Sequence, residues 1–208
     1  MEVSPIKFKV CGMKNTDNII QVSALSPDYM GFIFHEASPR FVGIDFSVPA
    51  NISSSVKRVG VFVNHSADFV IETMSRNQLQ YAQLHGDESV AFCDALKQQG
   101  VKIIKVFRVD EDFDFGSTNQ FELVSDFFLF DTKGKLYGGN ATSFDWNLLH
   151  QYNQAVPFFL SGGIQPQNMK DIKKLESLNI HAIDVNSGVE DCPGIKNMNK
   201  ISEIINQL

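Results

Sequence analysis

Short apolar runs rich in valine, isoleucine and phenylalanine recur along the chain at a spacing of roughly 20 to 28 residues. A polar or glycine-bearing stretch follows each run. The eight runs are KFKVCG (7–12), YMGFIF (29–34), RVGVFV (58–63), YAQLHG (81–86), KIIKVFRV (102–109), FFLFDT (127–132), PFFLSGG (157–163) and AIDVNSG (182–188). Their length and composition predict eight buried β-strands.

The segments between the strands mostly carry apolar residues three and four positions apart, the period of an amphipathic helix. This pattern predicts helices over residues 17–25, 66–77, 89–100 and 168–179. Ser66 and Asn168 are helix start signals, and Gly100 is a stop signal.

Strands that alternate with helices need crossover connections, which produce a parallel sheet. Eight such units in 208 residues match the lower end of the size range of a closed (β/α)8 TIM barrel. An open doubly wound sheet is the alternative, but no GxGxxG fingerprint follows the first strand, which ends in CGM. Since no linker or low-complexity segment interrupts the pattern, we predict an α/β fold with a single (β/α)8-barrel domain over residues 1–208.

Composition and charge narrow the functional classes. The net charge of −6 argues against a nucleic-acid partner, because such surfaces need clustered lysine and arginine. No apolar run approaches the roughly 18 residues of a membrane span, so no membrane partner is expected. The three cysteines are too few and too widely spaced for a disulfide framework or a zinc site, which favours free thiols and a cytoplasmic location. The composition and charge remain compatible with a small phosphorylated ligand.

Barrel enzymes place their active sites at the carboxyl ends of the strands, often with a phosphate site after strands seven and eight. Gly162 and Gly163 follow the seventh predicted strand, and Ser187 and Gly188 follow the eighth. Their unobstructed backbone N–H groups predict two loops that converge on one phosphate. The alternative is that these glycines only turn the chain.

Four other residues at strand ends carry candidate chemistry. Asp131 closes an apolar strand, so it is either a capping residue or a general acid at the barrel mouth. Arg40 is either a solvated loop arginine or a bidentate ligand for a carboxylate. A histidine placed like His85 is more often structural than a base, and we retain it as a substrate-binding candidate. Cys11 is either a space-filling thiol or one presented to a pocket, with Gly12 leaving room beside it.

The ordered set of strand ends resembles one family. The stretches KVCGM, GFIF with SPR, VGVFVN, QLHGDE, LFDT, YGG with FDW, LSGGIQPQN, and DVNSGVE with PG resemble phosphoribosylanthranilate isomerases, in register from about residue 8 to residue 196. The resemblance implies an Amadori rearrangement of a small phosphorylated substrate without cofactor or metal, by a monomer or a homodimer.

The resemblance also implies a role for each matching residue. Asp131 would be the general acid that protonates the ribose ring oxygen, and Cys11 the general base that removes the C2′ proton. Arg40 would hold the anthranilate carboxylate, and Asp184 would face the ribose. The phosphate would bind Gly162, Gly163, Ser187 and Gly188.

The sequence departs from the family pattern at two places, and two other functions remain open. Asn140 and Ala141 follow YGG where the family usually has a threonine or serine and a glycine, and Asn197 replaces the acid of the common PGKKD. An indoleglycerol phosphate synthase is a second enzyme class, although it would need a lysine where Cys11 stands. A barrel that binds a phosphorylated metabolite without catalysis is the third reading.

Overall fold

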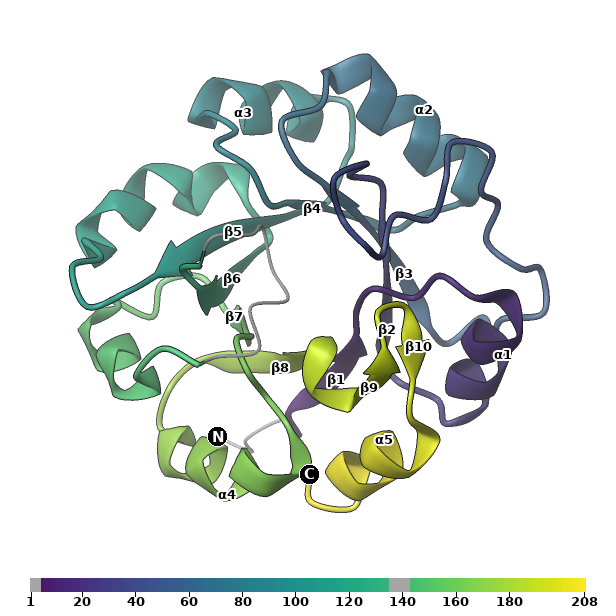
Figure 1. The fold of residues 1–208 in the computed structure, drawn as a ribbon. Helices are drawn as coiled ribbons and strands as arrows, with labels where there is room; N and C mark the ends of the chain where they lie inside the picture. The colour runs from purple at the N-terminus through teal and green to yellow at the C-terminus, as the bar shows by residue number, and fades with distance from the viewer. Residues whose placement is uncertain (1–4, 135–142) are drawn as a thin grey trace.

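Eight parallel strands form a closed barrel in the computed structural model, which describes residues 5–134 and 143–208. The strands pair in chain order, and β8 closes on β1 (Figure 1). They are β1 (Lys7–Val10), β2 (Tyr29–Ile33), β3 (Lys57–Phe62), β4 (Tyr81–Leu84), β5 (Ile103–Val109), β6 (Phe127–Thr132), β7 (Phe158–Leu160) and β8 (Ile180–Val185). The predicted TIM barrel and all eight predicted strands are confirmed, and the open sheet is excluded.

Helical segments surround the strands (Figure 1). The α-helices are α1 (Thr16–Ala24), α2 (Ala67–Asn77), α3 (Val90–Gln98), α4 (Met169–Ile172) and α5 (Met198–Ile205). The 3₁₀ segments are η1 (Phe115–Val124), η2 (Trp146–Gln151), η3 (Pro166–Asn168), η4 (Lys173–Leu175) and η5 (Ser187–Val189). None of the helices in the described part of the chain has the length and apolar character of a membrane span.

Local hydrogen bonds explain where the longer helices begin and end. The Ser66 side chain accepts a hydrogen bond from the backbone N–H of Phe69 and starts α2, as predicted. Gly100, with a φ of +81°, follows the end of α3. The helix predicted over 168–179 is instead short and divided into α4 and η4, with η3 before it, and the Asn168 side chain bonds the backbone at Gly163 and Gln165 and does not cap α4.

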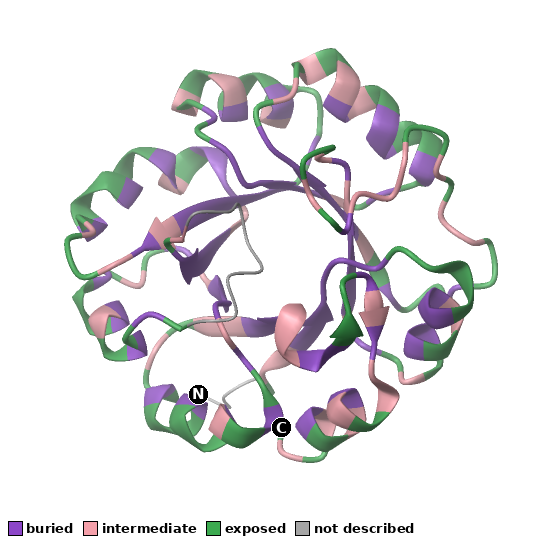
Figure 2. Cartoon of the chain, in the orientation of Figure 1, coloured by how far each residue is buried: buried purple, intermediate pink, exposed green. Residues whose placement is uncertain are grey.

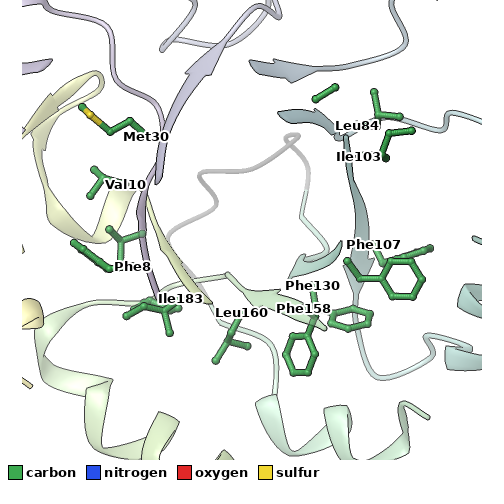
Figure 3. Close-up of a cluster of buried hydrophobic side chains, with 14 of the residues drawn as sticks. Phe8, Val10, Met30, Leu84, Ile103, Phe107, Phe130, Phe158, Leu160 and Ile183 are labelled. Carbon is green, nitrogen blue, oxygen red and sulfur yellow. The ribbon is translucent and has the colours of Figure 1, made fainter. Parts of the chain in front are cut away.

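The alternation of side chains along each strand separates two environments. Figure 3 shows one set, which includes Phe8, Val10 and Leu84, in the apolar layer outside the ring of strands. The opposite set points into the barrel, where an apolar plug forms below the mouth from Tyr29, Val59, Ile104, Val106, Leu129, Phe159 and Ala182. Burial follows this plan, with mostly buried strands and exposed outer helix faces (Figure 2). Residues at odd positions of β1, β4 and β6 therefore face the interior.

A short antiparallel hairpin follows β8 and was not predicted. Its strands are β9 (Glu190–Cys192) and β10 (Ile195–Lys196), and it lies beside β1 and β2 in Figure 1. Asn18 of α1 fastens it, since its side chain accepts from the Lys196 N–H at 2.7 Å and donates to the Lys196 carbonyl at 3.0 Å. Asn197 then caps α5 by accepting from the backbone N–H of Lys200. The departure at Asn197 thus preserves a helix cap.

Candidate active site

Cys11 lies directly after β1, buried at the barrel mouth. Its backbone N–H donates to the Val185 carbonyl of β8 at 2.8 Å, which fixes the residue across the closing seam of the barrel. The space beside the thiol is left by Gly31 of β2, where an added Cβ would lie 2.7 Å from Sγ. Gly12 has a φ of +73°, and a Cβ there would also meet the side chains of Asn186 and Arg40.

Lys9 stands two positions before Cys11 and therefore points into the barrel as well. Its side chain is fully buried, and Nζ donates to Asp184 Oδ1 and to Gln83 Oε1, both at 2.9 Å. Burial lowers the pKa of an ammonium, but the adjacent Asp184 carboxylate and the Cys11 thiol outweigh this effect and raise the pKa of Lys9. Lys9 is therefore a fixed positive charge inside the barrel.

The titration of the thiol depends on this charge. Burial raises the pKa of the Cys11 thiol above its usual value and the Asp184 carboxylate adds to this rise, while the positive charges of Lys9 and Lys196 offset only part of it. A thiolate is the form that can act as a base. The structure thus buries the thiol, which favours its neutral form, and places two cations near it that partly offset this effect.

Asp131 lies near the end of β6, across the barrel from β1 in strand order. The Thr132 N–H donates to Oδ1 at 2.9 Å, and His85 Nε2 lies 3.5 Å from Oδ2. The Nδ1 atom of His85 is 3.1 Å from Gln83 Nε2. Since Gln83 also contacts Lys9, a continuous line of buried polar groups joins the two ends of the barrel mouth.

Arg40 of the loop after β2 is held by the hairpin. Its Nε lies 2.9 Å from Glu190 Oε1, and its Nη2 lies 2.6 Å from Oε2. Lys196 donates to the same carboxylate at 2.7 Å and to Asn186 Oδ1 at 2.8 Å. Burial alone would raise the pKa of Glu190, but Arg40 and Lys196 hold it below its usual value. Burial lowers the pKa of Lys196 to about 8.

The Nη1 edge of the Arg40 guanidinium makes no hydrogen bond with the described residues. Among the described residues, hydrogen bonds reach Nε and Nη2 but not Nη1. A guanidinium carries five N–H donors in a planar fork. Glu190 therefore orients the fork while the Nη1 donors stay available for an anion.

The glycine loops after β7 and β8 meet, as the sequence predicted. Gly162 and Gly163 have φ values of +88° and +69°, the left-handed conformation that glycine adopts most readily. A Cβ on Gly188 would lie 2.1 Å from the Ile164 carbonyl oxygen, so only glycine permits this close approach of the two loops. Ser187 begins the short η5 turn beside them. Successive backbone N–H groups in a glycine-bearing turn can point toward one anion.

The chain matches a family model described as N-(5′-phosphoribosyl)anthranilate (PRA) isomerase over residues 8–207. The chain belongs to this family. An N-(5′-phosphoribosyl)anthranilate isomerase of Parabacteroides distasonis is 41% identical over 204 residues, which cover 97% of this chain and 92% of the relative. One of Phocaeicola vulgatus is 38% identical, with 97% of each chain covered.

Solved structures of phosphoribosyl anthranilate isomerases have the same fold. The Thermotoga maritima structure superposes with a TM-score of 0.83 at 28% identity, and 98% of each chain is covered. A second structure, with a TM-score of 0.80 at 27% identity and the same coverage, is a complex with reduced 1-(o-carboxyphenylamino)-1-deoxyribulose 5-phosphate. A relative of this barrel therefore binds a phosphorylated sugar derivative that carries a carboxyphenylamino group.

Four polar residues of the candidate site in this phosphoribosylanthranilate isomerase family member were not predicted from the sequence: Lys9, Gln83, Glu190 and Lys196. Lys9 and Gln83 each stand two positions before a predicted site residue, so strand alternation was the signal that could have found them. Glu190 and Lys196 belong to the unpredicted hairpin, for which no comparable signal exists. The motif YGG and the departures Asn140 and Ala141 lie outside the described residues. Within residues 5–134 and 143–208, no cluster of three His, Cys, Asp or Glu side chains could hold a metal ion.

Proposed function

We propose that this chain catalyses the isomerisation of N-(5-phosphoribosyl)anthranilate to 1-(2-carboxyphenylamino)-1-deoxyribulose 5-phosphate, a cofactor-free Amadori rearrangement of tryptophan biosynthesis. The observation that carries the proposal is the placement of Cys11 and Asp131 at one barrel mouth, on β1 and β6, joined by buried polar side chains. The family membership of the whole barrel supports it.

In the proposed first step, Asp131 is the general acid. Its carboxyl group donates a proton to the furanose ring oxygen, the bond between C1′ and this oxygen breaks, and the anilino nitrogen supplies the electron pair that forms the Schiff base. Asp131 leaves this step as a carboxylate. The buried position of the side chain, with Thr132 N–H against Oδ1, keeps it in one orientation for the transfer.

In the second step, Cys11 is the general base. Its thiolate takes the proton from C2′, and the electrons of the C–H bond form the enolamine, which tautomerises to the ketone. The carbon C2′ is oxidised and C1′ is reduced, so no external electron acceptor is needed. The cations Lys9 and Lys196 support the thiolate that this step requires.

The remaining site residues would bind the two anionic ends of the substrate. The free Nη1 edge of Arg40 suits the anthranilate carboxylate, because a planar guanidinium binds carboxylates well. The loops with Gly162, Gly163, Ser187 and Gly188 suit the phosphate. His85 and Asp184 are proposed to face the ribose, and the Asp184 carboxylate also accepts a hydrogen bond from Lys9.

The domain organisation, the cellular location and the oligomeric state are also proposals. We propose one catalytic domain over residues 1–208, a cytoplasmic location, and a monomer or a homodimer. A related structure concerns monomers made from the dimeric Thermotoga maritima isomerase, at 26% identity. Light scattering of the purified chain distinguishes the two oligomeric states.

The function is tested with freshly made phosphoribosylanthranilate, whose fluorescence changes on conversion. The wild type should turn over the substrate, whereas Cys11→Ser and Asp131→Asn should each lose about 10²- to 10⁴-fold in kcat. Cys93→Ser is the matched control, because Cys93 is a buried thiol of α3 outside the site. The mechanism is wrong if both site variants fold and keep the activity of the control.

A further inference from the structure

The side chain of Gln83 lies between a lysine and a histidine, and this position determines which way its amide faces. Lys9 Nζ is 2.9 Å from one end of the amide, and His85 Nδ1 is 3.1 Å from the other. An ammonium can only donate hydrogen bonds, so the amide oxygen must face Lys9. The amide NH₂ group must then face His85.

This orientation settles the position of the hydrogen on the His85 ring. The amide NH₂ can only donate, so Nδ1 must accept and carries no hydrogen. In the neutral imidazole the single hydrogen is then on Nε2. The hydrogen-bond network thus selects one tautomer.

The Nε2 atom of His85 faces the proposed general acid. It is buried, has no conventional hydrogen bond, and lies 3.5 Å from Asp131 Oδ2. The other carboxyl oxygen already accepts from the Thr132 N–H. A negative charge on Asp131 would therefore meet an N–H donor at each of its two oxygens.

We propose that His85 is a positioning residue for the acid step, and that Lys9 and Gln83 direct its Nε2–H at Asp131. When Asp131 has given its proton to the ring oxygen, His85 Nε2–H donates a hydrogen bond to the new carboxylate and stabilises it. The hydrogen stays on Nε2 throughout. The inference rests on the proposed role of Asp131 as general acid.

The backbone around His85 is held independently of Gln83, which makes the proposal testable. The His85 N–H donates to the Phe62 carbonyl at 2.8 Å. The Glu88 carboxylate accepts from the Gly86 N–H at 3.0 Å and pairs with Lys105 at 2.8 Å. A change in the Gln83 amide should therefore alter the ring nitrogens more than the loop.

The first test reads the tautomer directly by ¹⁵N NMR of histidine-labelled protein, with the His85 signals assigned from their absence in His85→Gln. In the wild type we expect a proton-bearing Nε2 and a bare Nδ1. In Gln83→Glu, whose carboxylate only accepts, Nδ1 should gain a hydrogen. The control Gln21→Glu makes the same change on the exposed face of α1 and should leave His85 unchanged. A wild-type His85 with its hydrogen on Nδ1 overturns the proposal.

The second test asks which nitrogen matters in turnover. The terminal amide of glutamine reaches about as far as Nε2, whereas that of asparagine reaches only as far as Nδ1. A hydrogen bond to a charged group corresponds to about 10- to 100-fold in rate. We expect His85→Asn to lose about 10- to 100-fold in kcat, and His85→Gln, which keeps a donor at the position of Nε2, to retain clearly more kcat than His85→Asn.

The outcomes separate this proposal from the proposed function. Equal kcat values for folded His85→Gln and His85→Asn overturn the positioning role, even if Asp131→Asn is inactive. Full activity of Asp131→Asn overturns the role of the acid, whatever the His85 variants do. The tautomer measurement needs no substrate and is decided independently of either result.

Discussion

Lys9 and Cys11 lie two residues apart on one edge of the barrel, and the ammonium of Lys9 bears directly on the titration of the thiol. Their spacing places both side chains on the interior face of the first strand. The same ammonium neutralises Asp184 on the last strand and orients Gln83 on the fourth. One buried cation therefore acts directly on the proposed base, Cys11, and reaches the proposed acid, Asp131, through Gln83 and His85.

Replacing Lys9 by methionine should destabilise the fold and remove a positive charge from beside Cys11, the proposed base. Asp184 would be left as an unpaired buried carboxylate, which costs about 3–5 kcal/mol in the free energy of unfolding. Urea denaturation measures this loss. Lys7→Met is the control, since the partly exposed pair of Lys7 and Asp28 should be worth less than about 1 kcal/mol. Equal losses in the two variants would contradict a structural role for the Lys9 charge.

Replacing Gly31 by alanine should displace the thiol. The new methyl group would lie 2.7 Å from Cys11 Sγ and 3.2 Å from its Cα, so the proposed base must move from its position. A displacement of about 1 Å can cost about 100-fold in turnover. We expect kcat to fall by at least about tenfold in the fluorescence assay.

Gly60→Ala provides the control for this change. Its methyl group would meet the ends of the Leu79 and Phe62 side chains at 2.7 Å, outside the site. Overpacking of this kind costs about 1–3 kcal/mol in stability. Gly60→Ala should therefore lose stability but keep kcat, and a comparable loss of kcat in both variants would argue against a specific effect on Cys11.

The buried Lys196 should make stability depend on alkaline pH. Its pKa is lowered by burial from 10.5 to about 8, so between these values the unfolded chain binds more protons than the folded one. Stability must then rise with pH across this window as the folded lysine loses its charge. The free energy of unfolding of the wild type, minus that of Lys196→Met, should increase by about 2–3 kcal/mol from pH 7.5 to 10. A flat or falling difference in denaturation curves would show that the charged form is not penalised.

Removing the charge of Glu190 should weaken substrate binding. Glu190 holds Nε and Nη2 of Arg40, so Glu190→Gln should release the guanidinium from its fixed orientation. We expect KM to rise by about tenfold, the equivalent of one charged hydrogen bond. Asp191→Asn makes the same change at the exposed neighbour and should leave KM unaltered. If Glu190→Gln instead lowers kcat alone, Glu190 acts on the chemistry through Lys196 and not through Arg40.

Much of the barrel could be predicted because most of its strands are rich in apolar residues. Parallel strands under a helical layer, such as β6, appear as unbroken apolar runs that stand out from their surroundings. The outer helices are weaker signals. The segment after β7 has the period of one long helix, yet it forms only the short segments α4 and η4, and Asn168 bonds the Gly163 carbonyl and does not cap α4.

The site was predicted where polarity coincides with a strand end, as at Cys11 and Asp131. It was missed where a polar side chain interrupts an apolar run, because Lys9 appears unremarkable until the barrel closes around it. The contact of Lys9 with Asp184 spans 175 positions in the sequence. No local pattern predicts a partner at that distance, and the hairpin that brings Glu190 to Arg40 has the same long-range character, with 150 positions between them.

The pairing of Lys9 with Asp184 also bears on how the chain is made. During synthesis the first strand leaves the ribosome long before the eighth. Lys9 therefore cannot pair with Asp184 until nearly the whole chain has been translated. The free energy that a buried cation needs from its partner thus becomes available only when the last strand docks against the first. Ring closure and the completion of the catalytic electrostatics are in this sense one event, and a chain arrested before residue 184 would lack both.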